Sequence, residues 1–286
     1  MSSPTPQSCP VLDCSELDRF HEEFFAANRP VLIRGFAEGQ RPGIFDWSPE
    51  FLEARLGDRE YPVMVGETGF FSYERDMVPM SYREFMARSF GAERDTERCY
   101  YFRQPTDALE NLHDDCEDIE PLAGYLRDSV VRNVWVSGPG PTVGMHFDPA
   151  ENLNFQICGR KRFVTFPPGL RGFYPLPMFS QTSCISGVFR QGPEPDLAKF
   201  PLFRPDEGVE IETRAGDLLY LPPYWWHQVE SLGERNVNLN VWWFPSAKKQ
   251  LRHLNQALRG YIQLGIRRFK YGNILKAPPE TADSRR

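Results

Sequence analysis

Apolar residues in the N-terminal third of the chain recur at spacings that alternate between helical and strand-like. Residues 15–28 place Leu17, Phe20, Phe24 and Phe25 on one side of a helix that begins near a capping serine. The same criteria predict further elements up to residue 89. Each expected helix among them begins at a serine that can cap it. These are strands over 30–35 and 61–66 and helices over 48–56 and 81–89.

From residue 99 onward, short apolar runs are separated by Gly and Pro, which is typical of strands joined by turns. Residues 167–208 form a Pro- and Gly-rich connection, and helical spacing returns after Pro245. The pattern predicts a mainly β protein with flanking helices, in which an antiparallel barrel or sandwich has an N-terminal cover. The expected strands are 99–103, 132–137, 152–157, 162–166, 209–213, 217–221 and 236–244.

Composition supports this assignment, because 14% of the 286 residues are aromatic and 26 prolines are scattered along the chain. The length suffices for one large domain or two small ones. We expect a flexible N-terminus over 1–14, a main domain over 15–245, a helical segment over 246–274 and a disordered tail over 275–286.

A net charge of −6 argues against a protein that binds polyanions through its overall charge. One stretch differs: seven basic residues occur between Lys248 and Lys270 without an acidic residue. Two interpretations are open. These residues form a surface that binds nucleic acid or an acidic partner, or they are the solvated side of an amphipathic helix. The sequence has no signal peptide, no membrane-spanning run and no Cys-x-x-Cys pair among its six cysteines. We therefore expect a reduced, cytoplasmic setting without membrane association.

A candidate metal site begins at His146 and Asp148, which point to the same face if they lie in a strand. His227 follows a strand and a Pro-Pro turn and is the expected third ligand. Two histidines and one carboxylate are the ligand set of non-heme Fe(II) oxygenases. The sequence His113-Asp-Asp115 has the same spacing but lies in an acidic stretch without an expected strand, so we interpret it as a solvated loop.

Lys161 follows Asp148 by thirteen residues and is a candidate for binding a carboxylate inside the barrel. In a strand, Lys161, Phe163 and Thr165 share one face. Arg160 and Arg162 are its competitors on the other face.

Together these motifs resemble the JmjC-type, cupin-like 2-oxoglutarate oxygenases, and within them the small hydroxylases typified by the asparaginyl hydroxylase of hypoxia-inducible factor. The resemblance extends from about Pro30 to Trp243. It implies a double-stranded β-helix, a jelly-roll core of the cupin type. The motifs are Trp47, Tyr100-Tyr101-Phe-Arg103, His146-Phe-Asp148, Asn152, Gly159-Arg-Lys161-Arg, Phe166-Pro-Pro, Pro195-Asp-Leu-Ala-Lys-Phe-Pro, Ala215-Gly-Asp217, Trp225-Trp226-His227 and Asn240-Val-Trp242.

The resemblance also implies the cofactors. His146, Asp148 and His227 would bind Fe(II), while Lys161 and Tyr101 would bind the distal carboxylate of 2-oxoglutarate. The reaction would consume O₂ and 2-oxoglutarate and release succinate and CO₂.

Three further cosubstrate-pocket residues follow from the resemblance alone. Asn152 and Asn240 match amides that line the pocket. Relatives often have a threonine three residues before the first metal histidine, where this chain has Val143. Either the turn is one residue shorter and Thr142 makes that contact, or the contact is absent; Thr142 is the candidate.

The sequence leaves several functions open. Hydroxylation of a protein or peptide side chain is the first reading, because the chain lacks the reader domains and zinc clusters expected of a histone demethylase. The stretch 195–203 and the basic C-terminal helix also resemble the tRNA-wybutosine hydroxylase, so oxidation of a modified tRNA base is the alternative. A metal-binding cupin that is not an oxygenase is a third reading, although it would not need a dicarboxylate site.

The C-terminal helix carries Leu251, Leu254, Leu258, Tyr261 and Ile262 at helical spacing. Related proteins use such helices to dimerise. A homodimer through this helix and a helix packed on its own barrel are both compatible with the pattern.

Overall fold

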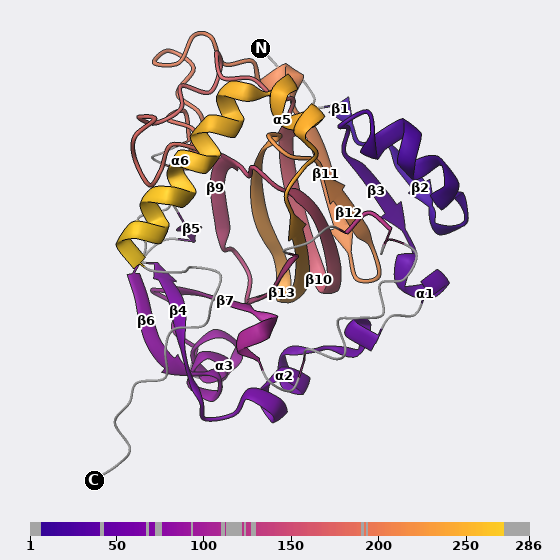
Figure 1. The fold of residues 1–286 in the computed structure, drawn as a ribbon. Helices are drawn as coiled ribbons and strands as arrows, with labels where there is room; N and C mark the ends of the chain where they lie inside the picture. The colour runs from indigo at the N-terminus through magenta and orange to yellow at the C-terminus, as the bar shows by residue number, and fades with distance from the viewer. Residues whose placement is uncertain are drawn as a thin grey trace.

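The computed structural model describes residues 7–271 except 41–42, 67–68, 72–75, 93, 110–111, 113–121, 123, 127–129, 190–191 and 193 (Figure 1). The expected tail over 275–286 and the first six residues of the expected flexible N-terminus lie outside this range. The expected core is present as a mainly β fold with helices at its margins. No helix of the described residues is both long enough and apolar enough to cross a membrane.

The described strands belong to one hydrogen-bonded sheet. We call the part that contains β8 and β12 its larger layer, and the part that contains β9 and β11 its smaller layer. Two long antiparallel strands, β10 and β13, run through both layers. One half of β10 pairs with β12 and the other with β11, while β13 pairs with β9 and then with β8. The strands are β1 (Gln7–Ser8), β2 (Val11–Asp13), β3 (Val31–Arg34), β4 (Glu60–Gly66), β5 (Phe70–Phe71), β6 (Asp76–Ser81), β7 (Cys99–Pro105), β8 (Val131–Ser137), β9 (Thr142–Phe147), β10 (Glu151–Phe166), β11 (Val209–Arg214), β12 (Leu218–Leu221) and β13 (Trp226–Trp243).

A bulge in β10 replaces the turn that the sequence suggests between the strands expected at 152–157 and 162–166. The pairing with β13 shifts register on both sides of Cys158, and Gly159 has φ +76°. A Cβ at Gly159 would lie 1.8 Å from the Arg235 carbonyl oxygen, so the close approach of the two backbones requires glycine. The bulge lets Asn152 and Lys161, of opposite parity, face the same interior.

The helices α2 and α3 begin as the sequence predicts. The Ser48 hydroxyl accepts a hydrogen bond from the Phe51 N–H, and the Ser81 hydroxyl accepts one from the Glu84 N–H. The helical elements are the 3₁₀ turns η1 (Cys14–Arg19), η3 (Gly43–Asp46), η4 (Thr106–Ala108) and η6 (Pro205–Glu207), the π-helical turn η2 (His21–Phe25), and the helices α1 (Phe36–Gln40), α2 (Pro49–Leu56), α3 (Tyr82–Phe90), α5 (Ala247–Arg252) and α6 (Leu254–Tyr271).

The single helix expected over 15–28 is instead a 3₁₀ turn followed by a π-helical turn. Phe20 and Phe25 both pack on Tyr125, with ring centroids 5.1 and 5.0 Å away, and both also contact Tyr220. Residues five apart share one face in a π-helix rather than in an α-helix, so aromatic packing selects the wider turn.

The N-terminal residues that we expected to be flexible form strands from Gln7 onward. β1 pairs in parallel with β11, and β2 pairs in parallel with β3. The Leu12 side chain is buried in the main apolar cluster. Hydrogen bonding to exposed sheet edges and burial of one leucine thus order a segment whose own pattern is weak.

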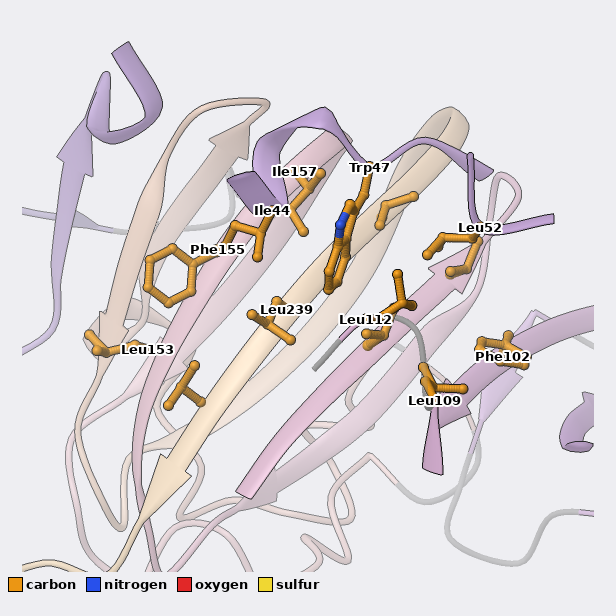
Figure 2. Packing of buried hydrophobic residues seen from close by; sticks show 14 of the residues in the cluster. Ile44, Trp47, Leu52, Phe102, Leu109, Leu112, Leu153, Phe155, Ile157 and Leu239 are labelled. Atoms are coloured by element: carbon orange, nitrogen blue, oxygen red, sulfur yellow. The ribbon is translucent and has the colours of Figure 1, made fainter. Parts of the chain in front are cut away.

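The main apolar core lies on one face of the larger layer (Figure 2). Trp47 and Leu52 pack there with Phe155 and Leu239 of the two long strands. The N-terminal elements therefore cover one face of the sheet. The opposite face of the same strands carries asparagines and is available for a polar site.

Candidate metal and cosubstrate site

Three candidate ligands converge where β9 meets the start of β13. His146 lies directly opposite His227 in the β9–β13 ladder, and Asp148 follows the end of β9. The Asp148 Oδ2 lies 4.0 Å from His146 Nε2 and 3.7 Å from His227 Nε2. One ligand atom from each residue lies within 4.8 Å of the other two. Ladder pairing therefore brings together side chains that are about eighty residues apart.

The backbone orients both imidazoles. His146 Nδ1 lies 2.8 Å from the Gly144 carbonyl oxygen, and His227 Nδ1 lies 2.9 Å from the Trp225 carbonyl oxygen. A carbonyl can only accept, so Nδ1 carries the proton and the Nε2 lone pair points at Asp148. Burial lowers the pKa of His227 against the opposing effect of Asp148, which keeps the ring neutral and able to bind a metal.

This donor set fits Fe(II). Two neutral imidazole nitrogens and one carboxylate on one side leave positions free for other ligands. Among the residues described, no other trio of His, Cys, Asp and Glu has this arrangement. The rival His113-Asp-Asp115 lies outside the described residues.

Lys161 points into the barrel from β10, as the strand alternation predicts. Its side chain is 2% exposed, and its Nζ donates hydrogen bonds to the Tyr101 hydroxyl at 2.8 Å and to Asn238 Oδ1. Within the described chain no carboxylate pairs with it, and burial lowers the pKa of Lys161 to about 7. Its competitors Arg160 and Arg162 point outward, toward Glu212 and Glu230.

A row of amides connects Lys161 to the strand that follows the metal ligands. Asn238 Nδ2 donates to Asn240 Oδ1 at 2.6 Å, and Asn240 Nδ2 donates to Asn152 Oδ1 at 2.9 Å. Asn154 Nδ2 also donates to Asn240 Oδ1, at 3.3 Å. The expected Asn152 and Asn240 are thus brought together with each other and with Lys161.

Sequence reasoning missed Asn238 and Asn154, although the signal was available. Both stand two residues from an amide that was identified, and residues two apart in a strand share a face. Ser231 was missed as well. It lies opposite Lys161 in the ladder and shares a 2.9 Å hydrogen bond with Ser137.

The structure does not bring Thr142 into this group. Thr142 pairs with the outward-facing Glu230, and its hydroxyl donates to the Gly140 carbonyl at 3.4 Å. Val143 pairs with Val229 and packs in a cluster with Tyr101. An irregularity in the β9–β13 register between His227 and Val229 puts Val143, rather than Thr142, on the inner face.

A family model described as "Cupin-like domain" matches residues 17–249. The match covers most of the chain, which therefore belongs to the cupin-like family of JmjC domains. Its relatives in this family include hydroxylases and tRNA-modifying proteins.

Three relatives illustrate the range. Lysine-specific demethylase 8 of Danio rerio is 29% identical over 82% of this chain and 58% of its own length. The human bifunctional peptidase and (3S)-lysyl hydroxylase JMJD7 is 26% identical over 83% of this chain and 84% of its own length. Human tRNA wybutosine-synthesizing protein 5 is 26% identical over 82% of this chain and 77% of its own length. The chain thus spans little more than half of the first of these proteins.

Proposed function

We propose that this protein is an Fe(II)- and 2-oxoglutarate-dependent dioxygenase that hydroxylates a protein or peptide side chain. His146, Asp148 and His227 would hold the iron. The bound iron and 2-oxoglutarate would supply the oxidative chemistry, in which O₂ is consumed and succinate and CO₂ are released.

The burial of Lys161 carries this proposal. A buried ammonium with only neutral hydrogen-bond partners is costly, and a carboxylate ligand would relieve that cost. Lys161 and Thr165 lie on the same strand face, and Thr165 is the ladder partner of His227. Lys161 and the metal ligand are thus four residues, or about 13 Å of strand, apart. A long lysine side chain and a short dicarboxylate together bridge such a distance. A cupin without a dicarboxylate cosubstrate has no use for this cation.

Each residue of the site has a defined task in this proposal. The Lys161 ammonium and the Tyr101 hydroxyl would donate to the distal carboxylate. Asn152 and Asn240 would orient the end of the cosubstrate that lies nearer the metal. The apolar pair Val143 and Val229 would exclude water from one side of the pocket.

Succinate formation by the full chain, supplied with Fe(II), 2-oxoglutarate and O₂, tests the reaction class. We expect slow turnover without substrate, and turnover that is abolished in the Asp148→Ala variant. Absence of succinate under all metal and substrate conditions would leave only the non-oxygenase cupin. Mass spectrometry of a peptide library should then detect a gain of one oxygen atom in the substrate.

The contacts of the basic C-terminal residues support a protein or peptide substrate over a nucleic acid. Lys249 is buried and donates to Glu151 Oε1 at 2.7 Å. Arg259 donates to the carbonyl oxygens of Leu176 and Ser183, and Arg267 donates to that of Gln181. Three of the seven basic residues thus serve internal contacts, which weakens the case for a nucleic-acid surface.

Oxidation of a tRNA base is the second candidate, because two relatives are named as wybutosine-synthesizing proteins. A mobility shift with bulk tRNA at low salt tests it. Tight binding that falls steeply with salt would favour this candidate over protein hydroxylation.

We also propose a homodimer formed through α5 and α6. Four of the five apolar residues noted in the sequence are exposed on these helices, among them Leu251 at 70% and Leu254 at 53%. Leu258 and Tyr261 continue the same exposed stripe. Contiguous exposed apolar surface of this kind is typical of interaction sites.

A further inference from the structure

Helix α6 lies against the segments that carry the candidate metal ligands (Figure 1, yellow, beside β9). Its inward side has three buried residues at helical spacing, Gln256, Gly260 and Gln263. The two glutamines are less than one-tenth exposed, and buried amides require hydrogen-bond partners. Both amides find them on the backbone next to the metal ligands.

Gln256 restrains the turn before His227. Its Nε2 donates to the Tyr224 carbonyl oxygen at 2.9 Å, and the Tyr224 N–H donates to the Asp148 carbonyl oxygen at 2.9 Å. Tyr224 has φ +70°, a left-handed conformation that is unfavourable for a residue other than glycine. A strained residue of this kind persists only when its surroundings hold it, and Gln256 supplies one of the restraints.

Gln263 and Gly260 act on the other side of the site. Gln263 Oε1 accepts from the Cys184 N–H at 2.9 Å, and the Cys184 carbonyl accepts from the Phe147 N–H at 3.1 Å. Phe147 lies between the ligands His146 and Asp148. A Cβ at Gly260 would lie 2.5 Å from Cβ of Pro149, the residue after Asp148.

We propose that α6 positions the metal site, with Gln256, Gly260 and Gln263 as positioning residues for the backbone around Asp148 and His227. The inference rests on the proposed function, since it takes the His–Asp–His group as the metal site. Asp148 lies beyond the end of β9 and lacks the restraint of a ladder. The helix provides the restraint instead.

The two glutamines have opposite hydrogen-bonding roles, which separates positioning from simple packing. Gln256 must donate, because its partner is a carbonyl, whereas Gln263 must accept, because its partner is an N–H. Glutamate can replace Gln263 and still accept from the Cys184 N–H. The charges of Arg259 and Arg267 act on Cys184 and would also favour a carboxylate beside it. Glutamate at Gln256 would instead direct a carboxylate at a carbonyl oxygen.

Titration of the metal-free full-length protein with Co(II) tests the proposal, with the dissociation constant and the visible d–d spectrum as readouts. Gln256→Met, Gln256→Glu and Gln263→Met should weaken Co(II) binding by about tenfold and change the spectrum. Gln263→Glu should bind within about threefold of the wild type.

Gly260→Ala has a matched control in the same helix. A Cβ at Gly265 meets nothing within 4 Å, so Gly265→Ala should keep the wild-type affinity and spectrum. Gly260→Ala should weaken Co(II) binding by about tenfold, because the new methyl group displaces either Pro149 or the helix.

Wild-type Co(II) affinity and spectrum in folded Gln256→Met and Gly260→Ala would overturn the proposal, even if both variants melt at lower temperature. If Gly260→Ala does not fold, the contrast between the two glutamate variants decides. Absence of Co(II) binding by the wild type would overturn the proposed function itself, and this inference with it.

Discussion

The burial and the hydrogen-bond partners of Lys161 indicate the kind of ligand that the site binds, which the metal motif alone does not. Its orientation follows from strand alternation, but its partners Tyr101 and Asn238 come from distant strands. Taking an ammonium out of water without a counter-ion is unfavourable, and the lowered pKa of Lys161 expresses that cost. Such a group is consistent with a site that is completed by an anion.

Replacing Lys161 should abolish stabilisation by the cosubstrate. We expect 2-oxoglutarate, with a bound divalent metal, to stabilise the wild type by about 2.7 kcal/mol at a hundredfold excess over its dissociation constant. Lys161→Met should show no such gain, because the carboxylate loses its cation. Thermal unfolding with and without the cosubstrate measures the difference. Arg160→Met removes an exposed neighbouring cation and should behave as the wild type, and equal stabilisation of both variants would contradict the assignment.

Cosubstrate affinity should depend on pH through the same residue. Below the Lys161 pKa of about 7 the ammonium is already present, whereas above it binding of the carboxylate must take up a proton. The dissociation constant of 2-oxoglutarate should therefore rise by up to about tenfold per pH unit as pH increases from about 7 to about 9. Calorimetry on the metal-loaded protein measures it. A flat profile over this range would exclude Lys161 as the titrating group.

At the scale of elements, the bulge in β10 decides which side chains reach the site. In a regular strand the inward positions would stay at even numbers after Asn152 and Asn154. The extra residue around Cys158 and Gly159 shifts them to odd numbers, so that Lys161 and Thr165 face inward. The bulge at Gly159, which has positive φ, thus lets the amides on one half of β10 and the cation on the other half face the same interior.

Gly159→Ala should be much more damaging than Gly233→Ala. The two glycines have nearly the same φ, +76° and +79°, but only Gly159 lies against another backbone. Gly233→Ala should cost about 1–2 kcal/mol, from backbone strain alone. We expect Gly159→Ala to cost more than about 3 kcal/mol, because the Arg235 carbonyl must move as well. Urea unfolding measures the free energy of unfolding of both variants. Equal losses would mean that the close approach of the Arg235 backbone to Gly159 does not add to the cost.

At the scale of the whole molecule, the larger layer has one apolar face, which is covered, and one polar face, which carries the candidate site. The N-terminal elements bury the apolar face of the larger layer, and the polar interior is left for the site. Helix α6 repeats this division, with Gln256 and Gln263 inward and Leu254 and Leu258 outward. The outer face is the part of this arrangement that a second copy would cover.

A charge on the outer face of α6 should separate the proposed dimer. We expect the wild type to dimerise at micromolar concentration and Leu258→Glu to be monomeric, because a buried unpaired carboxylate is unfavourable at an interface. Light scattering after size-exclusion chromatography measures the mass. Leu197→Glu changes an equally exposed leucine of the 167–208 connection and should remain dimeric. A monomeric wild type at all concentrations would disprove the dimer.

Local patterns were sufficient for much of the fold. Ser48 and Ser81 marked the starts of two helices, and alternation identified most strands and the inward direction of Lys161. These features depend on a residue and its near neighbours, so the sequence contains them directly.

Other features depended on contacts between distant segments. Packing of Phe20 and Phe25 on Tyr125 and Tyr220 selected the π-helical turn His21–Phe25, and sheet edges ordered β1 and β2. A register irregularity put Val143 in the place proposed for Thr142. Periodicity gives no information about these outcomes, because each is decided by a partner far away in the chain.

The sequence by itself determined a mainly β fold and named the residues of a candidate metal site. Only the tertiary structure decided that the Nε2 atoms of His146 and His227 meet the Asp148 carboxylate, and that α6 holds the backbone beneath them. Local free energies select strands and turns, whereas the convergence of side chains depends on register and bulges. These are set by the packing of the whole chain.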